Sequence, residues 1–227
     1  MAPSQEAEQK SDKKGQHEEK KQKKNLKLQY FTWILYMLSF TAQCAPHFVP
    51  MSYYPMKGQE ENVGKYLIPI LVSISGGLGI VSRPVAGLVT DKFNNRMIVA
   101  VISLVICGGL LVITAFVHTF AALLILAIFI GIIQGFYIGT ANAQWVDVFG
   151  LDNITLGSGL AAFAIGISAV ILHPVAGVLV DLTGNTDAMF LVFGGVQIIS
   201  GILLFIVKLL LTHQKNSRLK DQRVALY

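Results

Sequence analysis

The sequence predicts an all-α membrane domain of six transmembrane helices, and three observations support this prediction. The 227 residues are 53% hydrophobic and only 14% charged, whereas a soluble domain is about 25% charged. No Asp, Glu, Lys or Arg occurs in the ranges 28–56, 97–146, 154–180 and 188–207. A helix needs about 20 mostly apolar residues to cross a bilayer, so each range is long enough. A soluble enzyme, a secreted disulfide module and a disordered protein are therefore excluded.

Six spans are expected, because the longest charge-free block is long enough for two helices and residues 66–90 form a further apolar block whose only charge is Arg83. Their approximate bounds are residues 29–50, 66–90, 97–117, 121–146, 156–180 and 188–211. Only helices and closed barrels satisfy their backbone hydrogen bonds in lipid. Barrel strands are ~10 residues long and alternate in polarity, so these uniformly apolar blocks predict helices. Pro46 and Pro50 are expected to close the first span.

The two ends of the chain are polar. Residues 1–26 are rich in Lys, Glu and Gln and poor in hydrophobic residues, which predicts a disordered or loosely helical tail. Residues 27–212 are expected to form the transmembrane domain, and residues 213–227 a second tail. Eight of the 18 basic residues are lysines before residue 28, mixed with five acidic residues. The positive excess therefore belongs to a tail, and nucleic acid is not an expected partner.

The basic residues also predict the orientation. They gather in the two tails and in the 91–96 turn, whereas the opposite side offers only Lys57 and Lys65. The positive-inside rule then places both termini in the cytoplasm. Cys44 and Cys107 lie in apolar blocks and are expected to be packing residues. No cofactor and no metal site is expected.

One short segment occurs twice. Residues 83–91 (RPVAGLVTD) recur as residues 173–181 (HPVAGVLVD), with an offset of 90 residues that corresponds to three spans. Because three is odd, the two copies end at opposite membrane faces. The sequence thus predicts a three-plus-three inverted repeat, about 29–117 and 121–211, as in each half of a major facilitator transporter. Chance similarity between small-residue helix ends is the alternative.

The turn after the second span resembles the major facilitator loop signature G-x-x-x-D-[RK]-x-G-[RK]-[RK]. The matching residues are Gly87, Asp91, Lys92 and Arg96, whereas Asn94 and Asn95 depart from the signature. A carboxylate and cations at two joined helix ends can form an ionic latch that breaks and reforms. Asp91, Lys92 and Arg96 are therefore gating candidates, and an ordinary positive-inside turn is the alternative.

Within that superfamily, residues 28–212 resemble the C-terminal six-helix half of a monocarboxylate transporter. Residues 82–87 (SRPVAG) resemble an Arg-Pro-x-x-Gly element of the family's eighth helix, and the stretches at 147–150 and 174–177 agree. The resemblance implies alternating-access symport of small monocarboxylates or related organic anions across the plasma membrane. It also implies that Arg83 binds the substrate carboxylate.

The sequence departs from that family in two respects, which concern proton coupling and the N-terminal six-helix half. Gly79 stands where proton-coupled members carry an aspartate, one turn before the arginine. A lysine that those members carry belongs to an N-terminal half that this sequence lacks. The expected partners are therefore the lipid bilayer, a separate N-terminal half or a second copy of the chain, and an ancillary single-span glycoprotein as in some relatives. A non-transporting fragment or isoform that only associates with other membrane proteins is the alternative.

Arg83 is the strongest site candidate on physical grounds alone. It is the only Asp, Glu, Lys or Arg well inside a span, about 10 Å from the helix end at Thr90. A charge at such a depth costs roughly 2.5–3.5 kcal/mol and usually marks a transport pathway. A guanidinium can clamp a carboxylate with two parallel hydrogen bonds, although an arginine can also snorkel to the surface. Small residues are expected to leave room beside Arg83: Ser75, Gly76, Gly79 and Gly87.

Other residues have weaker signals. Gly131, Gly135 and Gly139 form a small-residue stripe in the fourth span, which predicts close helix packing. Several polar residues inside spans are candidates to face a water-filled path and contact substrate: Gln43, Gln134 and Asn142, and also His47 and Tyr137. Interhelical hydrogen bonds are the alternative role for each of them. His173 is expected to act as an external gate or to make a local hydrogen bond.

Overall fold

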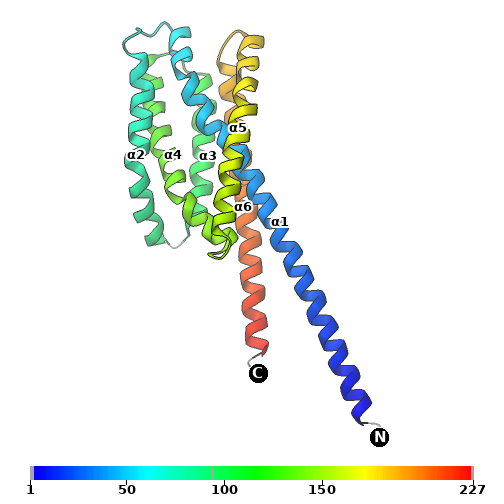
Figure 1. Cartoon of the computed structure of the whole chain (residues 1–227). Coiled ribbons are helices and arrows are strands. Elements are labelled where there is room, and N and C mark those ends of the chain that lie inside the picture. Colours follow the sequence, from blue (N-terminus) through cyan, green and yellow to red (C-terminus); the bar gives the residue numbers. More distant parts are fainter. Residues whose placement is uncertain (1–2, 94, 226–227) are drawn as a thin grey trace.

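The computed structural model describes residues 3–93 and 95–225. Of these it describes the backbone alone for residues 3–22, 24, 25, 45, 91, 93, 142 and 217–225. The described residues form six helices: α1 (Pro3–Glu60), α2 (Ile68–Phe93), α3 (Arg96–Ala115), α4 (Phe120–Phe149), α5 (Ile154–Thr183) and α6 (Asp187–Ala225). α2 to α5 and parts of α1 and α6 stand side by side, and the far ends of α1 and α6 extend beyond them (Figure 1).

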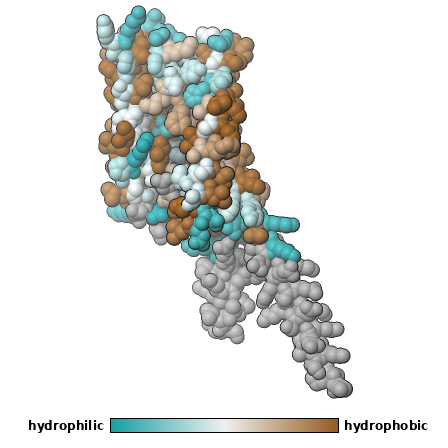
Figure 2. Space-filling view, in the orientation of Figure 1, coloured by the Kyte–Doolittle hydropathy of each residue, from teal (hydrophilic) through white to brown (hydrophobic). Residues whose placement is uncertain are grey.

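Five of these helices are long and apolar enough to cross a membrane. Their apolar parts are Ile68–Thr90, Arg96–Ala115, Phe120–Ala141, Ile154–Thr183 and Asp187–Asn216. Figure 2 shows brown apolar side chains over the sides of the helical body and teal hydrophilic ones at its two ends. The first expected span, residues 29–50, is helical within α1 but is not among the five. Gln43, Pro46 and His47 lower its mean hydropathy.

α1 is longer than expected at both ends. Its backbone is helical from Pro3, because Lys, Glu and Gln are good helix formers. Pro46 and Pro50 do not close the helix as predicted, and α1 continues to Glu60. Proline has the φ angle of a helix, and buried neighbours can satisfy the carbonyl groups that it leaves free. The chain turns only at Asn62, whose φ of 55° is left-handed.

The helix contacts come in related pairs. α2 packs on α4 and α1 on α5, while α1 packs on α6 and α3 on α4. Exchanging α1–α3 with α4–α6 converts each of these contacts into its counterpart, and it maps the α3–α6 contact onto itself. An inverted repeat of three helices would produce this pattern of contacts.

Inside the bundle, α1 and α6 are joined by two reciprocal hydrogen bonds. Ser39 Oγ donates to the Ser200 carbonyl at 2.9 Å, and Ser200 Oγ donates to the Ser39 carbonyl at 2.8 Å. The largest apolar cluster among the described residues includes Val49, Leu111 and Phe190. In lipid, such polar pairs and close packing hold helices together, because hydrophobic burial does not.

At the end of the bundle opposite the termini, an ion-pair cluster ties α1 to α6. Lys57 is 1% exposed, and its Nζ lies 2.6 Å from Asp187 Oδ1 and 2.8 Å from Glu61 Oε1. The ring of His118, between α3 and α4, lies 2.8 Å from the same Glu61 oxygen. Burial alone would lower the pKa of Lys57, but hydrogen bonds to Asp187 and Glu61 outweigh it and raise the pKa above its ordinary value.

Candidate functional site

The glycine stripe of α4 determines how α2 is placed. A Cβ at Gly131 would overlap the Ser75 carbonyl, and one at Gly139 would lie 2.6 Å from the Arg83 carbonyl oxygen. A Cβ at Gly135 would lie 2.5 Å from the Gly79 carbonyl. Only glycine therefore permits this approach of the two backbones, which confirms the predicted close packing.

Arg83 belongs to the row of α2 residues whose backbone touches α4. Its carbonyl and Cα lie against Gly139, yet its side chain is exposed. Among the described residues it forms no ion pair within 4 Å. Its charge acts on the ring of His47 in α1. α4 therefore holds the backbone of Arg83, and the guanidinium remains available on the side of α2 that α4 does not cover.

The room expected beside Arg83 is only partly present. Ser75 is buried, and both Ser75 and Gly79 face the glycines of α4 instead of a cavity. A Cβ at Gly76 would meet Met51 Cε of α1 at 3.1 Å, whereas one at Gly87 would meet nothing within 4 Å. The prediction was wrong for Ser75, Gly76 and Gly79, because a row of small residues attracts a neighbouring helix as readily as it leaves space.

A cavity of about 610 Å³ lies between α1, α2 and α5. Its lining is mostly apolar: Phe48, Met51, Ser52, Pro55, Val72, Ile165, Ala169 and His173. His173 Nδ1 lies 3.0 Å from the Ala169 carbonyl, so the local hydrogen bond that was one of its two expected roles is present. His173 and Ser52 are the two polar residues of this lining.

α2 and α5 are the least covered of the apolar helices. Only 22% of the residues in their most apolar windows are buried, against 44% for α3, α4 and α6. Within the described part of the chain, α2 and α5 make no extensive contact with each other. The two helices that carry the repeated segment are therefore the most exposed of the five, and the Arg83 side chain is exposed on α2.

Two of the weaker site candidates, Gln43 and Gln134, are buried within the bundle. Gln43 is buried and lies next to the Tyr137 side chain of α4. Gln134 is also buried and faces Cys107 of α3. Both therefore make interhelical contacts, the alternative raised by the sequence. The side chain of Asn142 lies outside the described residues.

The expected latch is described only in part. The Asp91 side chain lies outside the described residues, and Lys92 is exposed. Arg96 is half-buried, and its charge acts on Asp147 of α4. Asp147 and the lysines of α6 near it were not identified from the sequence. Their spacing along α6 was the available signal, since Lys208 and Lys215 are two turns apart.

Comparison with known proteins gives consistent results. The family model described as Major Facilitator Superfamily matches residues 36–225. Monocarboxylate transporter 12 of Mus musculus is 27% identical over 169 residues, which are 73% of this chain and 34% of that protein. Monocarboxylate transporter 2 of Mesocricetus auratus is 23% identical over 201 residues, 85% of this chain and 42% of that protein. The chain thus spans well under half the length of the curated relatives it matches.

Proposed function

The chain belongs to the Major Facilitator Superfamily, and from that premise we propose that it carries small monocarboxylates or related organic anions across the plasma membrane by alternating access. Members of this superfamily are multi-pass membrane transporters and not enzymes. The main evidence for an anionic substrate is Arg83. It is an exposed cation in an apolar helix, and it forms no ion pair among the described residues. The names of the distant relatives support the same class.

Arg83 supplies the chemistry that a carboxylate requires. Its planar guanidinium offers two parallel N–H donors, and its charge neutralises the anion in a region of low dielectric. α4 holds the Arg83 backbone through Gly139. The guanidinium is therefore attached to a rigid part of the bundle, as a binding group needs to be. Gln43, Gln134 and Asn142 remain candidates for contacts in another conformation.

The coupling ion is a separate matter. Position 79 is a glycine and so has no proton-carrying group. Proton symport by this chain therefore requires another titratable group.

We further propose that residues 29–50 of α1 form a sixth span and that α1–α3 and α4–α6 are inverted repeats. The paired helix contacts and the recurrence of residues 83–91 at 173–181 support this arrangement. With six spans and the positive-inside rule, both termini are cytoplasmic. We also propose that the unit is a C-terminal half, which the resemblance of residues 82–87 to an element of the monocarboxylate transporters' eighth helix supports.

The two least covered helices, α2 and α5, then meet a second six-helix unit. Halves of major facilitator transporters are related by an axis along the membrane normal and enclose the substrate between them. A separate N-terminal half, or a second copy of this chain, would cover Arg83 without inverting in the membrane. A non-transporting product that only associates with other membrane proteins is the second candidate function.

Uptake into liposomes tests the proposal. The full chain is reconstituted with lactate as the first probe, and lactate binding is measured in parallel by thermal shift. Arg83→Lys keeps the charge but loses the planar fork, so uptake or binding should fall at least tenfold, about 1.4 kcal/mol. Lys65→Gln, an exposed lysine at the other end of the bundle, is the control. Full activity of Arg83→Ala would contradict the role of Arg83, and a chain that neither binds nor transports would favour the second candidate.

A further inference from the structure

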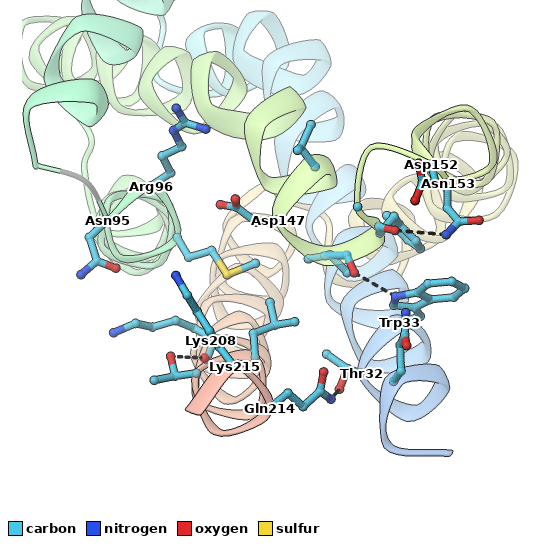
Figure 3. A pocket seen from close by; sticks show the side chains of 18 residues that line it. Thr32, Trp33, Asn95, Arg96, Asp147, Asp152, Asn153, Lys208, Gln214 and Lys215 are labelled. Atoms are coloured by element: carbon cyan, nitrogen blue, oxygen red, sulfur yellow. Dashed lines mark hydrogen bonds between the residues drawn. The ribbon is translucent and has the colours of Figure 1, made fainter. Parts of the chain in front are cut away.

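Another cavity, of about 920 Å³, lies at the end of the bundle where α1 and α6 extend beyond it. It is formed by α1, α3, α4 and α6 together with the start of the loop after α4 (Figure 3). Its volume is within the range of about 300–1,000 Å³ that small-ligand sites occupy. No residue of this cavity belongs to the substrate site proposed around Arg83.

Three cations line the cavity. Arg96 comes from the first turn of α3, and Lys208 and Lys215 come from α6. Lys208 and Lys215 are seven residues apart and so lie on one face of the helix. In Figure 3, Asp147 lies between Arg96 on one side and Lys208 and Lys215 on the other. The charge of this cavity therefore comes from two separate helices.

Two carboxylates lie among these cations. Asp147 and Asp152 line the cavity, so the described residues of the lining include three cations and two carboxylates. Burial raises the pKa of Asp147 above its ordinary value, although Arg96 and Lys215 act in the opposite direction. Asp147 is thus partly desolvated and within electrostatic reach of both cations.

The position of the lysines along α6 indicates the depth of the cavity. The charge-free part of α6, residues 188–207, is as long as a membrane span. Lys208 follows directly, within the last turn of the expected span 188–211, and so lies near the end of the apolar part of α6. Lys215 lies about 10 Å farther along the helix axis. The two lysines therefore lie toward the polar end of the helix, where phospholipid headgroups are expected.

We propose that this cavity binds the phosphate group of an anionic lipid. The phosphate oxygens accept hydrogen bonds from Arg96, Lys208 and Lys215, and the apolar side chains of Met97 and Leu211 in the same lining contact the glyceride part. Basic clusters beside transmembrane helices attract anionic headgroups. A soluble phosphate ester offers the same chemistry, and the position of Lys208 near the end of the apolar part of α6 favours the lipid.

The fluorescence of Trp33 reports on the cavity directly. Trp33 lines it and donates from Nε1 to the Val148 carbonyl at 2.9 Å. The chain has two tryptophans, so Trp145→Phe leaves Trp33 as the sole emitter. The full chain with this substitution, in neutral detergent, is titrated with dioctanoyl phosphatidic acid, dioctanoyl phosphatidylcholine and glycerol 3-phosphate.

We expect phosphatidic acid to bind saturably. Its affinity should be at least tenfold higher than the affinities of phosphatidylcholine and of glycerol 3-phosphate. Equal binding of glycerol 3-phosphate would overturn the lipid as the source and retain the phosphate site. If neither phosphate monoester binds, the proposal as a whole is wrong.

A charge series separates this site from general surface attraction. Lys208→Gln and Lys215→Gln should each weaken phosphatidic acid binding at least threefold, whereas Asp147→Asn should strengthen it. Lys27→Gln, an exposed lysine at the same end of the bundle but outside the cavity, should leave it unchanged. Misfolding would weaken binding in every variant, so it cannot explain stronger binding by Asp147→Asn together with weaker binding by the lysine variants. Equal effects of Lys27→Gln and Lys208→Gln would contradict the site.

The two proposals fail separately. Arg83→Ala removes the proposed substrate contact and should bind phosphatidic acid like the parent. Lys215→Gln should retain lactate binding. Loss of both ligands in both variants would contradict the assignment of two distinct sites.

Discussion

Lys57 illustrates how single charged residues are stabilised in this chain. The sequence marks it only as one of two basic residues on its side of the membrane. In the fold its buried ammonium group is held between Asp187 and Glu61, from different parts of the chain. Removing one partner of a buried pair leaves the other charge without compensation, which is the costly case for ion pairs.

Lys57→Gln should therefore destabilise the protein by roughly 2–4 kcal/mol. The glutamine keeps hydrogen-bonding capacity but leaves both carboxylates without a cation. Thermal unfolding in detergent measures the change, with Lys65→Gln as the matched control on the same side. An unchanged unfolding temperature for Lys57→Gln would show that the cluster is replaceable by water.

The same cluster predicts a loss of stability in acid. Burial alone would raise the pKa of Glu61, but Lys57 and His118 outweigh it and lower the pKa below its ordinary value. A carboxylate with a lowered pKa contributes stability that is present above its unfolded pKa and is lost as the pH falls through the folded pKa. Stability should thus decline below roughly pH 4, and Glu61→Gln should reduce this decline. Identical acid profiles for the parent and the variant would contradict the assignment.

The packing of α2 on α4 depends on backbone contact along one row of residues. Gly131, Gly135 and Gly139 recur at every fourth position, and each lies against main-chain atoms of α2. Because backbone cannot move aside like a flexible side chain, a methyl group there separates the helices. Arg83 would move with α2, so the packing of α2 on α4 also determines the position of the proposed substrate site.

Gly139→Ala should lower the unfolding temperature and weaken lactate binding together, because its Cβ would lie 2.6 Å from the Arg83 carbonyl. Overpacking of this kind costs about 1–3 kcal/mol. Gly109→Ala in α3 is the matched control, since its Cβ would meet nothing within 4 Å. Equal effects of the two substitutions would indicate a response to helix propensity and not to packing.

The bundle as a whole leaves two of its apolar helices, α2 and α5, less covered than the others. The face of α2 that carries the Arg83 side chain is exposed. A guanidinium facing lipid has few partners and costs several kcal/mol. A second six-helix unit on this face would relieve that cost.

We therefore expect the isolated chain to be dimeric or unstable, and to transport poorly without an N-terminal half. Gly87→Cys, one turn past Arg83, should give a cross-linked dimer in the membrane. Ile202→Cys, an exposed position on α6, should not. A stable monomer that transports lactate at ordinary rates would be the opposite outcome.

The sequence by itself determined the class and the family of this protein. Long charge-free blocks predict membrane helices whatever their neighbours are, because the bilayer is their solvent. The family match over residues 36–225 confirms the superfamily that the repeat and the loop after α2 indicate. Arg83 could be singled out because a charge in an apolar block is visible without any tertiary structure.

Only the tertiary structure decided which sides of the helices meet. Helical periodicity places Ser75, Gly79 and Arg83 in one row, but it does not tell whether that row faces a cavity or another helix. The α4 glycines cover the backbone of the row and leave the arginine side chain free. Likewise, Lys57 and Asp187 are separated by 130 residues. Their pairing depends on how α1 and α6 pack, because a contact between distant segments exists only once the chain has folded.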